Sequence, residues 1–288
     1  MEGPPEKIAE LVRKETEALG LSVDIQLLTP EEIEEALKKA ATSGASAVMV
    51  GGGDGTVMTA ARHLMGSSCA LIPLPFGTLN LLARDLGFPL DPTQALQALA
   101  KAELTQIDVA EVNGSLFLCV AVLGFYPAHA WKQKEEFHGA WWRKVIWSGQ
   151  QMFSSYFQYK ALNVEIRSKG TVQQFQTRSV AIFNNPFAEQ FGLVPQRHDL
   201  QKGKLGVYVS RHKSWLSIAR GILAFVLGSS KLDLDLESWE TADFTLQTRS
   251  RRKLKASLDG ELIEFEQPLQ FKINPGALQV LSMPQEKS

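Results

Sequence analysis

The chain has 288 residues, a formal net charge of −1 at pH 7, 44% hydrophobic residues and 21% charged residues. This length allows two domains or one large one, and the composition is that of an ordinary globular protein. A net charge close to zero provides no overall field for nucleic acid, so we expect no nucleic-acid partner. No stretch approaches the ~18 apolar residues of a membrane span, and the N-terminus lacks the apolar core of a signal peptide. We therefore expect a cytoplasmic protein.

The cysteines and histidines give no sign of a metal site. Cys69 and Cys119 lie in apolar, strand-like runs without ligand-like spacing, so we expect reduced core residues. The histidines are scattered without a partner motif, and none is predicted to be functional: His63, His129, His138, His198 and His212.

The first hundred residues alternate helical and strand-like patterns. A helical stripe ends at Gly20, and Val23, Ile25 and Leu27 then alternate as in a strand. Thr29-Pro30-Glu31-Glu32 is a capping box with proline at the first helical position. Strands are predicted at 46–50 and 69–74, and helices around 56–65, 78–86 and 93–101. This alternation predicts a mostly parallel sheet, which binds ligands at the carboxyl ends of its strands.

A glycine-rich loop, Gly51-Gly52-Gly53-Asp54-Gly55-Thr56, follows one of these predicted strands and opens a helix. We expect a buried parallel strand here, whose loop brings backbone N–H groups and the positive end of the helix dipole to one point. That arrangement suits a phosphate. Glycines permit positive φ and close approach of the backbone. Asp54 places a carboxylate where a phosphate-bound Mg²⁺ could be held. A tight turn with a capping Asp would use the same residues.

After about residue 106, short strand-like runs dominate. Turn pairs separate several of them, namely Asn113-Gly114, Lys169-Gly170 and Asp259-Gly260, which predicts an antiparallel sandwich or barrel. The runs lie at 107–112, 115–122, 161–167, 172–183, 205–210, 241–248, 252–258, 261–265 and 268–273. Helical inserts are predicted near 139–158 and 213–228. We predict two domains with a cleft between them, over 1–105 and 106–288, the last residues being able to return to the first domain.

Two further segments are informative in combination with the glycine loop: Pro75-Phe76-Gly77-Thr78-Leu79-Asn80-Leu81-Leu82-Ala83-Arg84-Asp85-Leu86-Gly87 and Ser257-Leu258-Asp259-Gly260-Glu261. In this order and spacing, the three segments resemble the diacylglycerol kinase catalytic family, which includes soluble bacterial lipid kinases and, more distantly, sphingosine and ceramide kinases. The resemblance implies an α/β fold: a three-layer nucleotide domain like that of phosphofructokinases and NAD kinases, followed by an antiparallel β-sandwich.

The resemblance also implies an ATP- and Mg²⁺-dependent lipid kinase with assigned residues. Glu261 would be the general base that takes the proton from the acceptor hydroxyl; from the residues alone it would be a strand-start residue. Asp54 would hold the Mg²⁺ that arrives with ATP. The residues near the nucleotide would be Thr29, Gly52, Gly53, Gly55, Thr56, Gly77, Thr78 and Asn80. Thr29 is equally explained by its capping box, and Asn80 by a turn.

Three features depart from the family pattern. The family usually opens with a strand ending in an Asn-Pro-x-Ser-Gly-like turn, whereas this chain starts at the following helix, so we expect that strand to be missing. Leu81 stands where many relatives have Asp. Gln201 and Lys202 replace an acidic pair at which a structural Mg²⁺ is bound, so we predict no structural Mg²⁺ site.

The substrate is expected to be a lipid at a membrane surface, with transient membrane association. Residues 137–159 mix aromatic residues with Arg and Lys, as in a surface that meets the bilayer or in a helix packed on the sandwich. Residues 215–227 could line an acyl pocket. The lipid is not identified, and a homodimer stays open.

Two alternative functions are weaker. An NAD kinase is disfavoured because segment 77–84 matches the lipid-kinase pattern. A non-catalytic lipid- or nucleotide-binding protein is suggested by the missing strand and acidic positions, but it would need neither Asp54 nor Glu261.

Overall fold

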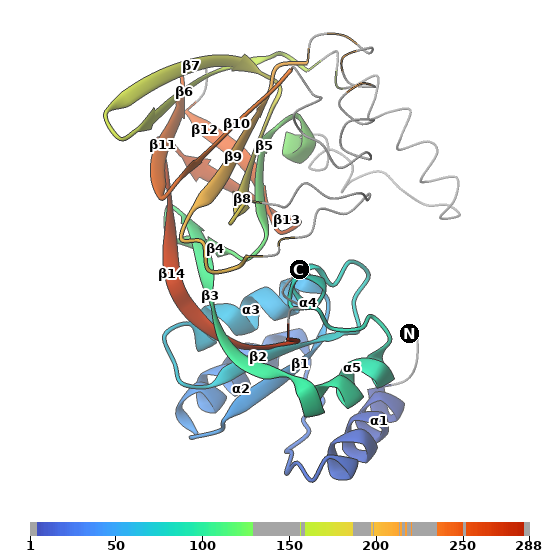
Figure 1. The fold of residues 1–288 in the computed structure, drawn as a ribbon. Coiled ribbons are helices and arrows are strands. Elements are labelled where there is room, and N and C mark those ends of the chain that lie inside the picture. The colour runs from blue at the N-terminus through green and yellow to red at the C-terminus, as the bar shows by residue number, and fades with distance from the viewer. Residues whose placement is uncertain are drawn as a thin grey trace, which may run out of the picture. The chain divides into compact units, whose positions relative to one another are not determined.

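The structure is a computed structural model, and its chain divides into two compact units. Unit 1 comprises residues Met1–Val109 and Pro275–Ser288, and unit 2 comprises Ala110–Asn274 (Figure 1). The described residues are 5–128, 159–186, 199–212, 235–249 and 252–284, together with Tyr156, Arg197, Ser214, Ser217 and Arg220. Most of the helical inserts predicted at 139–158 and 213–228 lies outside these residues. Within them, no helix is long and apolar enough to cross a bilayer.

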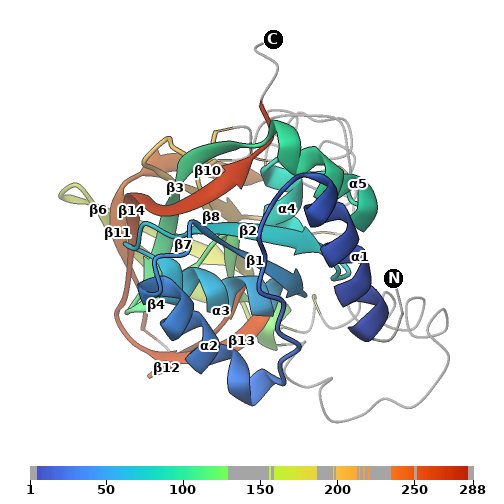
Figure 2. The same ribbon diagram turned by 90° about the horizontal axis from the view of Figure 1, so that it is seen from below.

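Unit 1 has a parallel sheet between two helical layers. Strands β1 (Ala47–Gly52) and β2 (Ala70–Pro75) pair in parallel, and the end of β14 (Leu269–Ser282) pairs in parallel with β2. The helices are α1 (Pro5–Ala18), α2 (Pro30–Thr42), α3 (Asp54–Leu64), α4 (Leu81–Asp85), α5 (Pro92–Ala98) and the 3₁₀ helix η1 (Leu99–Lys101). Figure 2 shows α2 and α3 on one face of β1 and β2, and α1 and α5 on the other. Every residue of β2 is consequently buried.

The ends of these helices follow from local sequence. The first helix stops before Gly20, which has φ 70°, a conformation that glycine adopts without steric cost. Helix α5 begins after Asp91, whose carboxylate accepts a hydrogen bond from Gln94 N at 2.9 Å, with proline at the first helical position. The predicted helices of unit 1 are confirmed, although the one predicted at 78–86 is shorter.

The strand predicted around residues 23–27 is not formed. Residues 22–28 make no backbone hydrogen bond within the described part of the chain, and Leu21, Leu27 and Leu28 are 44%, 53% and 39% exposed. An alternating pattern makes a strand only where a neighbour supplies backbone partners. The edge strand of the sheet, β1, has β2 as its neighbour in the described residues. Because one edge of β1 has no neighbouring strand in the described residues, most residues of β1 are half-buried. The sequence predicted a buried strand here.

Unit 2 is an antiparallel β-sandwich, which confirms the predicted fold class. One sheet has the order β10-β9-β8-β5-β12-β13, and its neighbours are all antiparallel. In the other sheet, β7, β6, β11 and the first half of β14 pair in turn, also antiparallel. β3 (Glu103–Val112) runs from unit 1 into unit 2. The other strands are β4 (Ser115–Phe117), β5 (Val120–Gly124), β6 (Leu162–Ser168), β7 (Thr171–Thr177), β8 (Ser179–Asn184), β9 (Leu205–Ser210), β10 (Leu236–Thr241), β11 (Asp243–Thr248), β12 (Lys253–Leu258) and β13 (Glu261–Glu266).

The turn pairs fix the hairpins of unit 2. Asn113, Lys169 and Asp259 have φ values of 47°, 48° and 48°, and the glycine after each is also positive. Positive φ at both central residues is the two-residue turn that matches strand twist, so the three predicted hairpins are confirmed. The runs predicted as single strands at 115–122 and 172–183 are each two strands, because the chain changes partner inside them.

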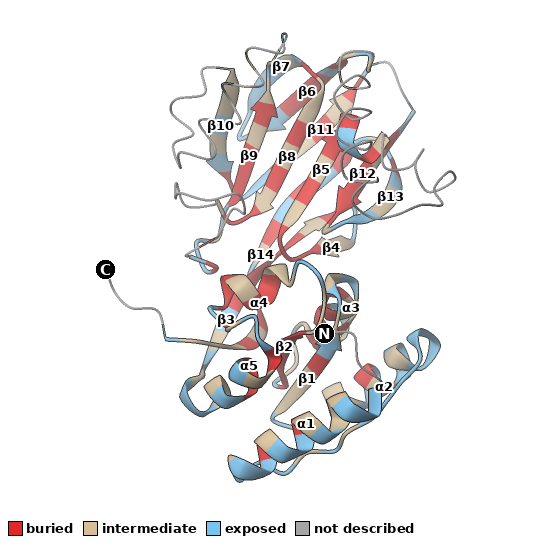
Figure 3. Cartoon of the chain, turned by 90° about the vertical axis from the view of Figure 1, so that its right-hand side faces the viewer, coloured by how far each residue is buried: buried red, intermediate tan, exposed pale blue. Residues whose placement is uncertain are grey.

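The sandwich core is built from alternate residues of both sheets, as the alternating buried and half-buried positions of β8 show (Figure 3). Phe244 stacks on Phe271 at 4.8 Å between ring centroids, and Phe117 meets Phe271 edge-on at 6.5 Å. These aromatic contacts join residues from three strands, which stabilises the sandwich beyond the area that they bury.

Candidate functional site

The two predicted phosphate segments meet at the carboxyl ends of β1 and β2. Asp54, the first residue of α3, accepts a hydrogen bond through Oδ1 from Leu81 N, the first residue of α4, at 2.7 Å. Gly77 packs against Gly53 so closely that a Cβ on Gly77 would lie 2.8 Å from Gly53 Cα. The structure thus brings together the segments that the sequence singled out, at the edge where parallel sheets bind ligands.

The glycines of the first loop serve close packing rather than unusual backbone angles. The sequence suggested two reasons for these glycines, positive φ and close approach of the backbone. None of the glycines at 51–55 has positive φ, so the first reason is wrong. A Cβ on Gly51 would lie 2.8 Å from the Phe76 ring, and a Cβ on Gly52 2.7 Å from Thr56 Oγ1. A Cβ on Gly53 or Gly55 would meet nothing within 4 Å. These two glycines therefore border open space, where a ligand can approach the backbone.

Two alanine substitutions separate these roles. Gly52→Ala is expected to lower the free energy of unfolding by about 1–3 kcal/mol, because the added methyl group overlaps the Thr56 side chain. Gly55→Ala is expected to leave it unchanged or raise it by up to about 1 kcal/mol, because alanine favours a helix and meets open space here. Thermal unfolding of both variants beside the wild type checks this. A Gly55→Ala protein that unfolds well below the wild type would assign Gly55 to the fold.

Asp54 has the features of a metal ligand. Asp54 is half-buried at the start of α3, and the hydrogen bond from Leu81 N orients its Oδ1. The second carboxylate oxygen makes no hydrogen bond within the described residues, so it is available to a cation. Oxygen ligands of this kind suit Mg²⁺, which binds through one or two carboxylates together with phosphate oxygens. The site residues therefore fit a phosphate-bound Mg²⁺.

Asn80 is a turn residue in the second loop. Its φ is 51°, its Oδ1 accepts a hydrogen bond from Gly77 N at 2.8 Å, and its Nδ2 donates to Gly77 O at 2.9 Å. Arg84 holds the same loop by donating from Nε to Leu79 O at 2.8 Å. Thr78 is exposed in this loop. Its contact with a nucleotide stays a prediction, as does that of Asn80.

Thr29 and Thr56 both occupy helix starts. At Thr29 the predicted capping box is present: the Glu32 carboxylate accepts hydrogen bonds from Thr29 N at 2.8 Å and from Thr29 Oγ1 at 3.0 Å. The backbone N–H and then the hydroxyl of Thr29 lower the pKa of Glu32. Thr56 N donates to Gly53 O at 2.9 Å in the first turn of α3. The capping contact explains Thr29 without a nucleotide, whose proximity stays a prediction.

Glu261 is exposed and is the first residue of β13, directly after the turn formed by Asp259 and Gly260. The side chain of Asp259 binds this turn to residues 118–120, at the start of β5, the strand that pairs with β12 on the side away from β13. The Asp259 carboxylate accepts hydrogen bonds from Leu118 N at 2.6 Å, Cys119 N at 3.0 Å and Val120 N at 2.7 Å. Sequence analysis gave Asp259 a turn role and the resemblance placed it in a motif, but neither predicted that it binds three consecutive N–H groups.

Arg197 is a further residue that sequence analysis missed. It is 4% exposed and donates from one terminal nitrogen to Leu118 O at 2.6 Å and to Asn184 O at 2.5 Å. Its other terminal nitrogen donates to Cys119 Sγ at 3.3 Å. Cys119 and Cys69 are free and buried, as predicted. No motif contains Arg197, and its partners are known only once β5 and β8 are paired.

Lys202 lies in an ion pair on the surface of unit 2. Its Nζ is 2.5 Å from Glu240 Oε1 on β10, and Lys204 Nζ is 3.5 Å from Glu240 Oε2. The hydrogen bond from Lys202 is the main cause that lowers the pKa of Glu240. In the described part of the chain, no three His, Cys, Asp or Glu side chains form a metal-binding group. The absence of a structural Mg²⁺ site stays a prediction.

Thermal unfolding tests how the loop of Lys202 is held. We expect EDTA to leave the unfolding temperature unchanged, and Lys202→Met to lower the free energy of unfolding by at most about 1 kcal/mol, because the pair is partly exposed and screened. The lowered pKa of Glu240 sets how the stability contributed by the Lys202–Glu240 pair depends on pH. Stability from this pair is present at neutral pH and is lost as pH falls through the lowered pKa. A large fall in unfolding temperature with EDTA would contradict the prediction of no structural metal.

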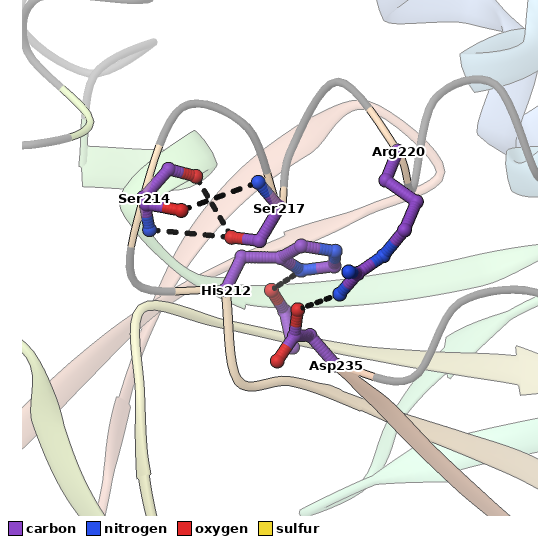
Figure 4. Close-up of polar contacts among 6 residues, drawn as sticks. His212, Ser214, Ser217, Arg220 and Asp235 are labelled. Atoms are coloured by element: carbon purple, nitrogen blue, oxygen red, sulfur yellow. Dashed lines mark hydrogen bonds and ion pairs between the residues drawn. The ribbon is translucent and has the colours of Figure 1, made fainter.

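The remaining polar cluster lies at the end of β9 and the start of β10 (Figure 4). His212 Nδ1 forms a 2.7 Å hydrogen bond with a serine hydroxyl of β9. Asp235 pairs with Arg220, and Ser214 and Ser217 exchange hydrogen bonds in the manner of a helix cap. Local contacts account for these groups, and the absence of a catalytic part for His212 stays a prediction.

Part of the predicted substrate surface is described. Tyr156 and Tyr159 pack edge-on against Phe125 at 5.3 and 6.0 Å between ring centroids, and the Arg178 guanidinium lies 5.6 Å from the centre of the Tyr156 ring. For these two tyrosines, the structure supports packing on the sandwich. The other aromatic residues of 137–155 lie outside the described residues, so the membrane-facing interpretation stays a prediction.

Solved structures of similar fold come from Bacillus anthracis. A diacylglycerol kinase crystal structure matches with a TM-score of 0.64 and 20% identity, covering 90% of this chain and 84% of that chain. A putative diacylglycerol kinase matches with a TM-score of 0.66 and 22% identity, covering 90% and 85%. At these identities the likeness defines the fold: an α/β unit and an antiparallel β-sandwich.

The family comparison is more specific. Residues 2–112 match the diacylglycerol kinase catalytic domain, so the resemblance indicated by the three motifs is confirmed. Over 262 residues the chain is 27% identical to a probable lipid kinase, YegS-like, of Pseudomonas fluorescens, covering 86% of this chain and 81% of that protein. A protein of the same name from Yersinia pestis is 35% identical over 112 residues, which cover 37% of this chain and 38% of that protein.

Proposed function

We propose that this protein is an ATP-dependent kinase that transfers the γ-phosphoryl group to a hydroxyl of a lipid. The observation that carries the proposal is the hydrogen bond from Leu81 N to Asp54 Oδ1, which joins the two glycine-containing segments into one anion-binding edge. The names of the curated relatives, which are probable lipid kinases, support the lipid acceptor.

The nucleotide phosphates are expected against the open glycines of the first loop. Gly53 and Gly55 border open space, and the first turn of α3 directs the positive end of its helix dipole there. Thr56 and Thr78 add hydroxyl groups beside this surface. Gly77 contributes by close packing, since a larger residue there would meet Gly53 and push the two segments apart, and Gly52 leaves room for the Thr56 side chain. Asp54 would hold Mg²⁺, which supplies charge neutralisation for the phosphates when bound.

The acceptor hydroxyl needs a base because an alcohol is a poor nucleophile. Glu261 takes the hydroxyl proton on its carboxylate while the hydroxyl oxygen forms a bond to the γ-phosphorus and ADP leaves with the bridging oxygen. The exposed position of Glu261 at the start of β13 leaves its carboxylate accessible to a substrate. The turn held by Asp259 gives this residue a fixed backbone.

The test is phosphate transfer from radiolabelled ATP and Mg²⁺ to lipids in mixed micelles. The acceptors are diacylglycerol, monoacylglycerol, phosphatidylglycerol, sphingosine and ceramide, with NAD as a comparison. A labelled lipid that requires Mg²⁺ supports the proposal and identifies the acceptor. Label on NAD alone would replace the proposal with an NAD kinase. ATP binding without label on any acceptor would favour a non-catalytic binding protein.

A further inference from the structure

We propose that Arg197 is a positioning residue for phosphoryl transfer: through the backbone of residues 118–120 and Asp259, it fixes the turn that presents Glu261. The inference rests on the proposed function, in which Glu261 is the general base.

The first step is the contact of Arg197 with two strands of one sheet. Its side chain is almost completely enclosed and donates to Leu118 O at 2.6 Å, just before β5, and to Asn184 O at 2.5 Å, at the end of β8. The buried amide of Asn184 reinforces this junction, since its Nδ2 also donates to Leu118 O, at 2.9 Å. Arg197 thus holds the carbonyl side of the segment that enters β5.

The second step is that the same peptide groups bind Asp259 from their N–H side. The peptide between Leu118 and Cys119 accepts from Arg197 through its carbonyl and donates to Asp259 through its N–H, at 3.0 Å. This peptide therefore connects a cation to an anion. Each hydrogen bond polarises the next, so the chain Arg197–peptide–Asp259 is stronger than its separate members.

The third step leads from Asp259 to Glu261. Asp259 has φ 48° in a two-residue turn, and the residues on either side of the turn, Leu258 and Glu261, are paired across the hairpin. Asp259 N also donates to Val120 O at 2.9 Å, so the turn is bound to β5 from both its backbone and its side chain. A shift of residues 118–120 would move the turn and, with it, the first residue of β13. Displacements of about 1 Å can cost roughly 10²-fold in rate.

The charge of Arg197 also matters for the ionisation of Asp259. Burial raises the pKa of the Asp259 carboxyl group, while the three N–H groups and the charge of Arg197 oppose this rise. Among the charged groups of the described residues, Arg197 is the one that acts on Asp259. Without it the pKa of Asp259 rises further, so the carboxylate takes up a proton at a higher pH. A protonated Asp259 cannot accept all three hydrogen bonds.

The experiment compares Arg197→Met and Arg197→Lys with the wild type. A matched control is Arg167→Met, which removes a surface arginine of β6 whose side chain is 59% exposed. In Arg197→Met we expect turnover to fall roughly tenfold to hundredfold with little change in KM for ATP, and the acid limb of the pH–rate profile to move to higher pH. Hydrogen exchange of the amides at 118–120 should become faster. Arg197→Lys should keep the wild-type pH profile and recover part of the turnover, and Arg167→Met should match the wild type.

Several results would overturn the inference. Wild-type turnover in Arg197→Met would do so, as would a loss of turnover with unchanged pH profile and unchanged exchange at 118–120. If Arg197→Met does not fold, Arg197→Lys tests the inference instead. Wild-type turnover in Arg197→Lys would contradict the proposed role, and so would an acid limb shifted to higher pH. Failure of the proposed function is distinguishable, because the wild type would then transfer phosphate to no lipid before any substitution is made.

Discussion

Replacement of Glu261 by glutamine is expected to lower lipid phosphorylation by roughly 10²–10⁴-fold, the usual contribution of a general base. Glutamine has nearly the same shape but cannot accept the proton of the hydroxyl. Because Glu261 is an exposed residue of unit 2 and the glycine loop belongs to unit 1, ATP affinity should be nearly unchanged. Turnover with saturating lipid and calorimetric ATP titration measure the two quantities separately.

Glu266→Gln is the matched control for this substitution, since Glu266 is an exposed carboxylate at the other end of β13. Its turnover should equal that of the wild type. If Glu261→Gln also retains full turnover, Glu261 has no part in the chemistry and is a strand-start residue, as its sequence context alone suggested.

Asp54→Asn is expected to preserve the fold and to lower kcat/KM for Mg·ATP by about 10²–10³-fold. The asparagine Oδ1 can still accept the hydrogen bond from Leu81 N, so the two loops should stay joined. The lost negative charge removes a ligand for the cation that neutralises the phosphates, an effect of several kcal/mol. The measurement is turnover as a function of Mg²⁺ concentration, together with thermal unfolding.

Asp91→Asn provides a close comparison. Asp91 is the N-cap residue of α5 in unit 1, and its carboxylate also accepts a backbone hydrogen bond, from Gln94 N at 2.9 Å. Unlike Asp54, it does not lie in the glycine loop. It should leave Mg²⁺ dependence unchanged. An Asp54→Asn protein that is merely less stable, with normal Mg²⁺ dependence, would reduce Asp54 to a residue that joins loops.

Local signals were sufficient for much of the fold. The capping box at Thr29, the positive-φ turn pairs and the apolar run of β2 each depend on neighbouring residues, and each is present in the structure. The two loops at the carboxyl ends of β1 and β2 also meet, because parallel strands bring their ends to one edge.

Features that depend on distant partners were not predictable. Residues 23–27 have the pattern of a strand but no strand beside them. The contacts of Arg197 and Asp259 with residues 118–120 link positions 78 to 141 residues apart in the sequence, so no local pattern indicates them. For Asn80 the sequence left a turn and a ligand open, and the structure shows the amide used within its own loop.

The chain enters unit 2 at residue 110 and returns to unit 1 at residue 275, so unit 2 is an insertion within unit 1. One neighbour of β2 is β1, which precedes unit 2 in the sequence, and the other is the end of β14, which follows unit 2. During translation, unit 2 can therefore pair its strands up to β13 while the sheet of unit 1 still lacks a strand. Assembly of the unit 1 sheet must wait for residues 275–282, which follow unit 2 in the sequence, and deletion of these residues should damage a sheet whose other strands precede unit 2.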